Sequence, residues 1–294
     1  MPGLTRGRLT IRAPALASGG MVDSVAIETG TLRSGHPFAR IGSGSRLVLS
    51  LPSLSFIQEA TTPKAAGRLW RSWLDPIARH DLTVMDVGRR PDLPPGSTAA
   101  DIADDYAAVI REQWGKAVRV MGFSSGGGYA QWLAIRHPEL VDRLVLAFTG
   151  HRITDEAREA QRRAVDHALA GRWRAGYATL GPWFVPDHPR IAGAALWIVG
   201  PLVGGRRMDL RPLRIDADAD DAFDASGRIG EIRCPTLVLS GGRDRAYPPE
   251  VTRELVAGIP GARHIDYPTA GHGGPGKPAA EAACAFLHDD QTPT

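Results

Sequence analysis

The chain is poor in cysteine, with only Cys234 and Cys284 among 294 residues. A small secreted domain held by several disulfides is excluded, because that framework needs more cysteines at closer spacing. The pair also lacks the spacing of a metal site, and H-E-x-x-H is missing, so the sequence indicates no metal. We expect two small buried side chains in a protein of the reducing cytoplasm.

Long uninterrupted apolar segments are missing as well. The longest apolar run, residues 191–205, is broken by glycines and a proline. It is also shorter than the roughly 20 residues that a membrane-spanning helix requires. We therefore expect no membrane partner, and we interpret this run as a buried or pocket-lining helix.

Charge of one sign is nowhere concentrated. The 35 basic and 32 acidic side chains are interleaved and leave a net charge of +3. Nucleic-acid binding is not expected, because it would require a basic stripe or patch. Residues 1–20 carry three arginines and no acidic residue, but they lack the apolar segment of a secretory signal. We expect these residues to be a disordered tail, or to precede a true start at Met21.

What the sequence does contain is an alternation of short apolar segments with helical ones. A hairpin is expected between residues 21 and 44, and the predicted buried strands follow at 46–51, 82–87, 117–122, 143–148, 235–242 and 263–268. Several are apolar throughout, which is typical of strands buried on both faces of a parallel sheet. Strands that alternate with helices predict the α/β class, with right-handed crossovers.

The interval from 151 to 230 interrupts this alternation. It is too long for one crossover, shows no clear strand and opens with a charged helical pattern. We predict a core formed by 21–150 and 231–294, and a helical cap formed by 151–230. The aromatic residues of this interval include Trp183, Phe184 and Trp197. They predict an apolar substrate pocket, although packing of the cap onto the sheet explains them equally well.

One stretch carries a chemical motif. Residues 122–126, GFSSG, match G-x-S-x-G between a predicted strand and a predicted helix, which is where a nucleophile elbow lies. This turn exposes Ser124 in a strained backbone conformation beside the helix N-terminus, where the amide of Ser125 can stabilise an oxyanion. The alternatives are a tightly packed glycine turn and a phosphate-binding turn, but no phosphate fingerprint accompanies it.

A serine nucleophile needs a base, and the base needs an orienting carboxylate. The elbow motif predicts the order Ser, acid, His along the chain. Asp244 and His272 follow two successive predicted strands, at carboxyl ends where such a sheet places its chemistry. The other acids that we considered are Asp155, after the strand at 143–148, and Asp86, which precedes Ser124 and so breaks the order.

With Ser124, Asp244, His272 and the elbow, the chain resembles the α/β-hydrolase superfamily over residues 21 to 290. The resemblance implies a mostly parallel eight-stranded sheet, a helical lid and hydrolysis without a cofactor. Many members carry His-Gly after the strand that corresponds to 46–51, followed by an amide that completes the oxyanion hole. Here the sequence is LPSLSF. Pro52 has no N–H, so the second donor is the amide of Ser53 or Leu54, and we favour Leu54.

We therefore expect a serine hydrolase that forms an acyl-enzyme with a small-molecule substrate. The first choice of bond is the carboxylic ester of a small, largely apolar substrate. A carbon–carbon bond hydrolase and an acyltransferase or perhydrolase use the same triad and stay open. The hypothesis from another class is a ligand-binding protein without turnover on this scaffold. An apolar lid could also serve as the surface of a homodimer.

Overall fold

The computed structural model of the chain describes residues 25–54, 62–184, 187–203 and 211–290. The predicted tail, residues 1–20, and the alternative start at Met21 lie outside these ranges. Within them, eight strands form one sheet: β1 (Ile27–Thr31), β2 (Pro37–Ile41), β3 (Arg46–Leu51), β4 (Leu82–Val87), β5 (Val118–Phe123), β6 (Val141–Ala147), β7 (Thr236–Gly241) and β8 (Arg263–Tyr267).

The sheet runs in the order β1-β2-β4-β3-β5-β6-β7-β8. The predicted hairpin forms β1 and β2, which pair antiparallel with each other, and β2 pairs antiparallel with β4. All pairs from β4 to β8 are parallel. The α/β class and the mostly parallel eight-stranded sheet are therefore confirmed. The largest shift of a boundary is in β6, which starts two residues before the predicted strand at 143–148.

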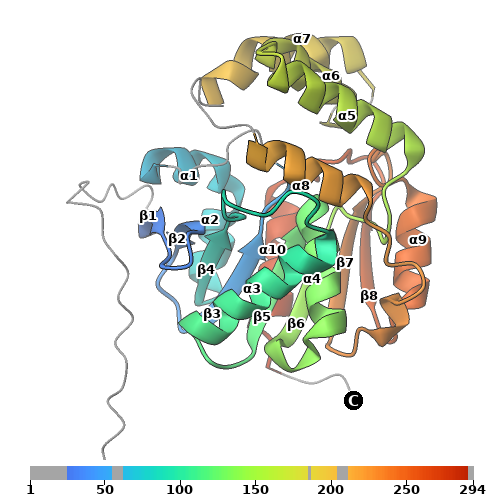
Figure 1. Cartoon of the computed structure of the whole chain (residues 1–294). Helices are drawn as coiled ribbons and strands as arrows, with labels where there is room; N and C mark the ends of the chain where they lie inside the picture. Colours follow the sequence, from blue (N-terminus) through green and yellow to red (C-terminus); the bar gives the residue numbers. More distant parts are fainter. Residues whose placement is uncertain (1–24, 55–61, 185–186, 204–210, 291–294) are drawn as a thin grey trace, which may run out of the picture.

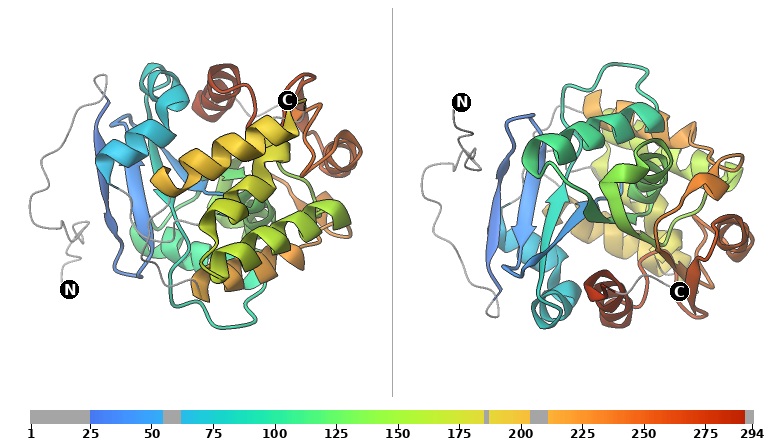
Figure 2. Two further views of the ribbon diagram at one scale, coloured as in Figure 1. Left: turned by 90° about the horizontal axis from the view of Figure 1, so that it is seen from above. Right: turned by 90° about the horizontal axis from the view of Figure 1, so that it is seen from below.

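Helices cover both faces of the sheet (Figures 1 and 2). The helices outside the interval 151–230 are α1 (Pro63–Leu69), α2 (Arg71–Arg79), α3 (Ala99–Gln113), α4 (Ser125–Arg136), α9 (Pro249–Gly258) and α10 (Lys277–His288). Helices α3 and α4 belong to one hydrophobic core and α2 and α10 to another. In β6, Leu144 and Leu146 point into the first core, and Val145 and Ala147 point into the second. Burial on both faces explains why this strand is apolar throughout.

The interval between β6 and β7 is helical, as the sequence indicated. It contains α5 (Asp155–Leu169), α6 (Trp173–Phe184), α7 (Pro189–Val203) and α8 (Arg211–Asp221). Figure 1 shows α5, α6 and α7 above the sheet, with α8 between them and the core. An isolated antiparallel bridge between Arg152 and Asp224 joins the two ends of the interval. No helix in the described part of the chain is long and apolar enough to cross a membrane.

Candidate active site

Ser124 stands at the turn between β5 and α4. Its backbone has φ 54° and ψ −124°, in the left-handed half of φ that residues with a side chain rarely adopt. The turn is tight enough to require the glycines around it. A Cβ atom on Gly122 would lie 2.5 Å from the carbonyl oxygen of Gly126, and one on Gly126 would collide with the carbonyl oxygen of Leu51. The G-x-S-x-G spacing is thus explained by steric contacts at this turn.

Three side chains from three separate loops form a chain of hydrogen bonds. Ser124 Oγ lies 2.9 Å from His272 Nε2, and His272 Nδ1 lies 2.9 Å from Asp244 Oδ2. All three residues are buried. Asp244 follows β7, and His272 follows β8. Ser124, Asp244 and His272 are therefore brought into contact at the carboxyl ends of the parallel strands β5, β7 and β8.

Backbone groups hold the carboxylate of Asp244 in place. Its Oδ1 atom accepts hydrogen bonds from the amides of Ala246, at 2.8 Å, and Tyr247, at 3.0 Å. The other oxygen, Oδ2, forms the hydrogen bond with His272 Nδ1. An ionised carboxylate only accepts hydrogen bonds, so Nδ1 of His272 must donate to it. In the neutral imidazole, Nε2 is then the acceptor that faces the hydroxyl of Ser124.

Aromatic rings surround the imidazole of His272. The ring centroids of Trp183, Phe184 and Tyr247 lie 5.7, 5.8 and 5.8 Å from it, respectively. The backbone amide of His272 also donates to the carbonyl oxygen of Trp183 at 2.9 Å. Two of the three aromatic residues predicted for the pocket, Trp183 and Phe184, therefore lie against the ring of His272. These contacts connect α6 to the site.

Trp197 is placed differently. About half of its surface is exposed, and its ring packs against the guanidinium of Arg174, 4.4 Å from the Arg174 Cζ atom. Among the described residues, no ring contact joins it to His272. Its role in substrate binding stays a prediction, as does a dimer surface on the lid.

Tyr247 was not found from the sequence. Burial, with the nearby charges of Asp220 and Asp244, raises its pKa well above the ordinary value, although hydrogen bonds with Ser124 and Thr149 oppose the rise. Its phenol is therefore protonated and lies beside Ser124. Its position three residues after Asp244 was a signal that sequence reasoning could have used.

The residues expected to form the oxyanion hole lie next to each other. Ser125 is the first residue of α4, so its amide is one of the unpaired donors of a helix N-terminus. The amide of Leu54 donates to the side-chain hydroxyl of the same residue, Ser125 Oγ, at 2.6 Å. The predicted second donor thus faces the elbow, although a hydroxyl occupies it in this structure.

The alternative acids lie elsewhere. The side chain of Asp155 is 97% exposed and pairs with Arg158 at the start of α5. Asp86 accepts a hydrogen bond from Ser50 Oγ at 2.9 Å, and burial raises its pKa to about 6. In the ranges that the structure describes, no group of three or more His, Cys, Asp or Glu side chains is arranged to hold a metal ion.

Known proteins share this sequence pattern. Residues 88–274 match the family described as serine aminopeptidase, S33. The pimeloyl-[acyl-carrier protein] methyl ester esterase of Chromobacterium violaceum is 31% identical over 180 residues, which cover 58% of this chain and 68% of that protein. The enzyme of the same name from Neisseria meningitidis serogroup B (strain MC58) is 29% identical over 226 residues, or 76% of this chain and 84% of that protein.

Solved structures share the fold. The enol-lactonase from Burkholderia xenovorans LB400 has a TM-score of 0.68 at 19% identity, over 92% of this chain and 100% of that one. MGS-M2, an α/β hydrolase from a deep-sea metagenome library, has a TM-score of 0.73 at 15% identity, over 94% of this chain and 99% of that one. The chain therefore belongs to the serine aminopeptidase S33 family of the α/β-hydrolase superfamily, and it is an esterase-like hydrolase.

Proposed function

We propose that the chain hydrolyses carboxylic esters through an acyl-enzyme on Ser124. The observation that carries this proposal is the continuous hydrogen-bond chain from Ser124 through His272 to Asp244. A serine hydroxyl becomes a nucleophile when a neighbouring base can take its proton, and this chain supplies a base whose ring is held by a carboxylate.

In the proposed mechanism, His272 Nε2 takes the proton of Ser124 as Oγ attacks the ester carbonyl. The carbonyl oxygen becomes an oxyanion, which the amides of Ser125 and Leu54 stabilise by hydrogen bonds. The charge that develops on His272 is stabilised by Asp244. His272 then donates the proton to the departing alcohol, and the acyl group stays on Ser124. Water, activated by the same imidazole, releases the acid and restores the serine.

The surroundings of the base support an apolar acyl group. Trp183 and Phe184 of α6 lie against His272, so we further propose that residues 151–230 act as a cap that lines the site. Such a lining favours apolar substrates with few polar groups. The two curated relatives described above are named as methyl ester esterases. We therefore propose a largely apolar acyl chain esterified to a small alcohol as the substrate class.

Two measurements test the proposal. A panel of p-nitrophenyl esters of increasing acyl length should show turnover with an optimum length. A fluorophosphonate should label Ser124 covalently, as located by mass spectrometry. Ser124→Ala should abolish both signals and leave the protein folded, whereas Ser226→Ala, a change at an exposed serine, should alter neither.

The alternatives make different predictions in the same assay. A carbon–carbon bond hydrolase would cleave a β-diketone faster than any ester of the panel. An acyltransferase would transfer the acyl group to an added alcohol in preference to water. A folded protein in which Ser124 is neither labelled nor needed for ester cleavage would contradict the proposal outright.

A further inference from the structure

The peptide group between Ser53 and Leu54 is held from both sides. Its carbonyl oxygen accepts a hydrogen bond from Arg89 Nη2 at 3.0 Å, and its N–H donates to Ser125 Oγ at 2.6 Å. In a trans peptide the C=O and N–H bonds point in opposite directions. A group that fixes the carbonyl therefore also fixes the direction of the amide.

Arg89 holds two successive carbonyls of this loop. Its Nη1 atom donates to the carbonyl oxygen of Pro52 at 2.5 Å, in addition to the bond from Nη2 to Ser53. The guanidinium is planar and carries its donors in a fixed arrangement, so it can bind two carbonyls and a carboxylate together. Arg89 lies just after β4, and 5% of its surface is exposed.

The charge of Arg89 is matched by Asp216 on α8. Arg89 Nη2 forms a short ion pair with Asp216 Oδ2, and Tyr129 of α4 donates to Asp216 Oδ1 at 2.5 Å. Asp216 is fully buried, and the guanidinium of Arg89 lies over the ring of Tyr129, 5.6 Å from its centroid. Further hydrogen bonds help a buried ion pair to persist. Arg89 has two of them, to the carbonyl oxygens of Pro52 and Ser53, and Asp216 accepts from Tyr129, whereas the buried Nε of Arg89 has no hydrogen-bond partner among the residues that the structure describes.

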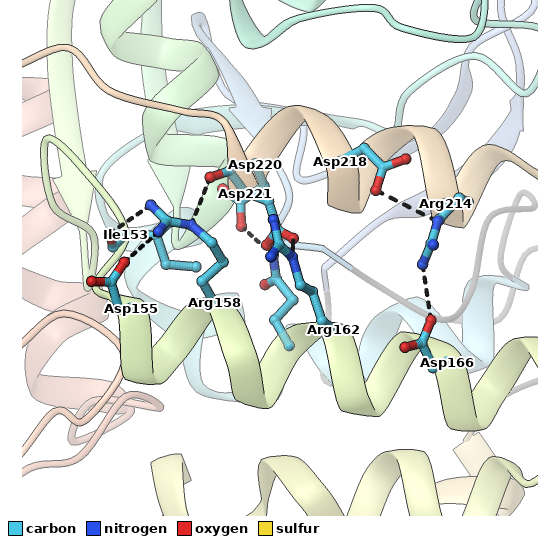
Figure 3. Close-up of polar contacts among 10 residues, drawn as sticks. Ile153, Asp155, Arg158, Arg162, Asp166, Arg214, Asp218, Asp220 and Asp221 are labelled. Carbon is cyan, nitrogen blue, oxygen red and sulfur yellow. Dashed lines mark hydrogen bonds and ion pairs between the residues drawn. The ribbon is translucent and has the colours of Figure 1, made fainter.

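Helix α8 is in turn bound to α5, as Figure 3 shows. Arg162 Nε pairs with Asp221 at 2.5 Å, and Arg214 Nη1 pairs with Asp166 at 2.9 Å. One side of α8 therefore contacts α5 through charged pairs, and another contacts the core through Asp216. Helix α8 therefore connects α5 to Arg89 and, through it, to the loop at Pro52–Leu54.

We propose that Arg89 is a positioning residue that, together with Asp216, directs the amide of Leu54 toward the elbow, so that docking of α8 completes the oxyanion hole. This assignment rests on the proposed function. Many α/β hydrolases have His-Gly where this loop has Pro52-Ser53. In this chain, we infer, a buried ion pair with α8 sets the direction of the Leu54 amide.

The test uses the full-length chain and three graded variants. Arg89→Lys keeps the charge but places all three N–H donors on one atom, so it loses the planar geometry that holds the two carbonyls and the carboxylate. Asp216→Asn removes the ionic partner, and Tyr129→Phe removes one hydrogen bond to Asp216. The matched control is Arg143→Met on β6, because Arg143 is as buried as Arg89 and lies over the ring of Phe286. For each protein, kcat and KM on a p-nitrophenyl ester, affinity for a trifluoromethyl ketone and thermal unfolding are measured.

Removing one oxyanion donor lowers kcat by a factor of about 10²–10³. We expect kcat of Arg89→Lys to fall by nearly this factor, and KM to change by less than about threefold. The affinity for the trifluoromethyl ketone, which forms an oxyanion on Ser124, should fall in parallel with kcat. The fall in kcat and in ketone affinity should be smaller for Asp216→Asn than for Arg89→Lys, and smallest for Tyr129→Phe. Arg143→Met should unfold at a lower temperature and keep kcat, which separates positioning from stability.

The outcomes distinguish this inference from the proposed function. A wild-type protein that cleaves no ester and is not labelled at Ser124 would contradict the proposed function, and the inference with it. An active wild type with unchanged kcat and ketone affinity in Arg89→Lys and Asp216→Asn would overturn the inference alone. If those two variants do not fold, Tyr129→Phe decides: a parallel fall in kcat and ketone affinity supports the inference, and unchanged values overturn it.

Discussion

The hydroxyl of Ser125 accepts a hydrogen bond from the amide of Leu54, 2.6 Å away. These are the two residues whose amides are proposed to stabilise the oxyanion. A substrate oxygen that enters between the amides must replace this contact, since one N–H cannot serve both acceptors fully. Under the proposed function, we therefore expect the hydroxyl of Ser125 to be displaced from the Leu54 amide when substrate binds.

Ser125→Ala tests this relationship. Loss of the hydroxyl leaves the Leu54 amide without its partner, and we expect a loss of about 1 kcal/mol in the free energy of unfolding, measured in urea. Both amides remain, so kcat should stay within tenfold of wild type, whereas a lost oxyanion donor costs about 10²–10³. A loss of that larger size would instead indicate that the hydroxyl itself stabilises the oxyanion.

Ser124→Gly should be more stable than Ser124→Ala. The backbone of residue 124 has φ 54° and ψ −124°, a conformation in which a Cβ atom is strained and glycine is not. Strain of this kind costs on the order of 1–3 kcal/mol, and the flexibility of glycine in the unfolded chain offsets part of the gain. Urea unfolding of both inactive variants measures the difference. If Ser124→Ala were as stable as Ser124→Gly or more stable, the inference that the backbone at residue 124 is strained would be wrong.

Asp244→Asn should impair turnover without disturbing the fold. Asparagine can still accept from the amides of Ala246 and Tyr247, but its NH₂ group would then face Nδ1 of His272 and turn that atom into an acceptor. The proton moves to Nε2, which can no longer accept from Ser124. In a serine protease the same change lowers kcat by about 10⁴, and we expect a loss of similar order. Steady-state kinetics with circular dichroism as the folding control measures it.

The buried carboxyl of Asp220 makes stability depend on pH. Burial raises its pKa to about 7, and the charges of Asp216 and Asp221 add to the rise, which Gln161 and Arg89 oppose. Between the ordinary aspartate pKa and about 7, the folded state binds one more proton than the unfolded state. The free energy of unfolding therefore falls as pH rises through this range.

Asp220→Asn removes this titration and keeps an oxygen that accepts from the amide of Gln161, at 2.9 Å in the wild type. Relative to this variant, we expect wild type to lose on the order of 2 kcal/mol between about pH 5 and about pH 8. Denaturant unfolding at both pH values measures the change. The matched control is Asp218→Asn, an exposed carboxylate on the same helix. A difference between wild type and Asp220→Asn that does not depend on pH would contradict the assignment.

Much of the fold could be predicted because its determinants are local. Strands buried on both faces are apolar throughout, as in β6, and the glycines of the elbow stand where a side chain would collide with backbone. Asp244 and His272 could be predicted from their positions after parallel strands, because such strands end at one edge of the sheet. Each of these inferences requires only a short stretch of sequence and a rule of topology.

The sequence alone thus determined the strands, the elbow and the order of Ser124, Asp244 and His272 along the chain. Tertiary structure decided which groups surround them: Trp183 and Tyr247 against His272, and Arg89 paired with Asp216, which lies 127 residues further along the chain. No local pattern marks such partners. In the sequence, a buried arginine cannot be distinguished from an exposed one. Arg89 is buried only because α8 packs over it, and its charge then requires a carboxylate as partner.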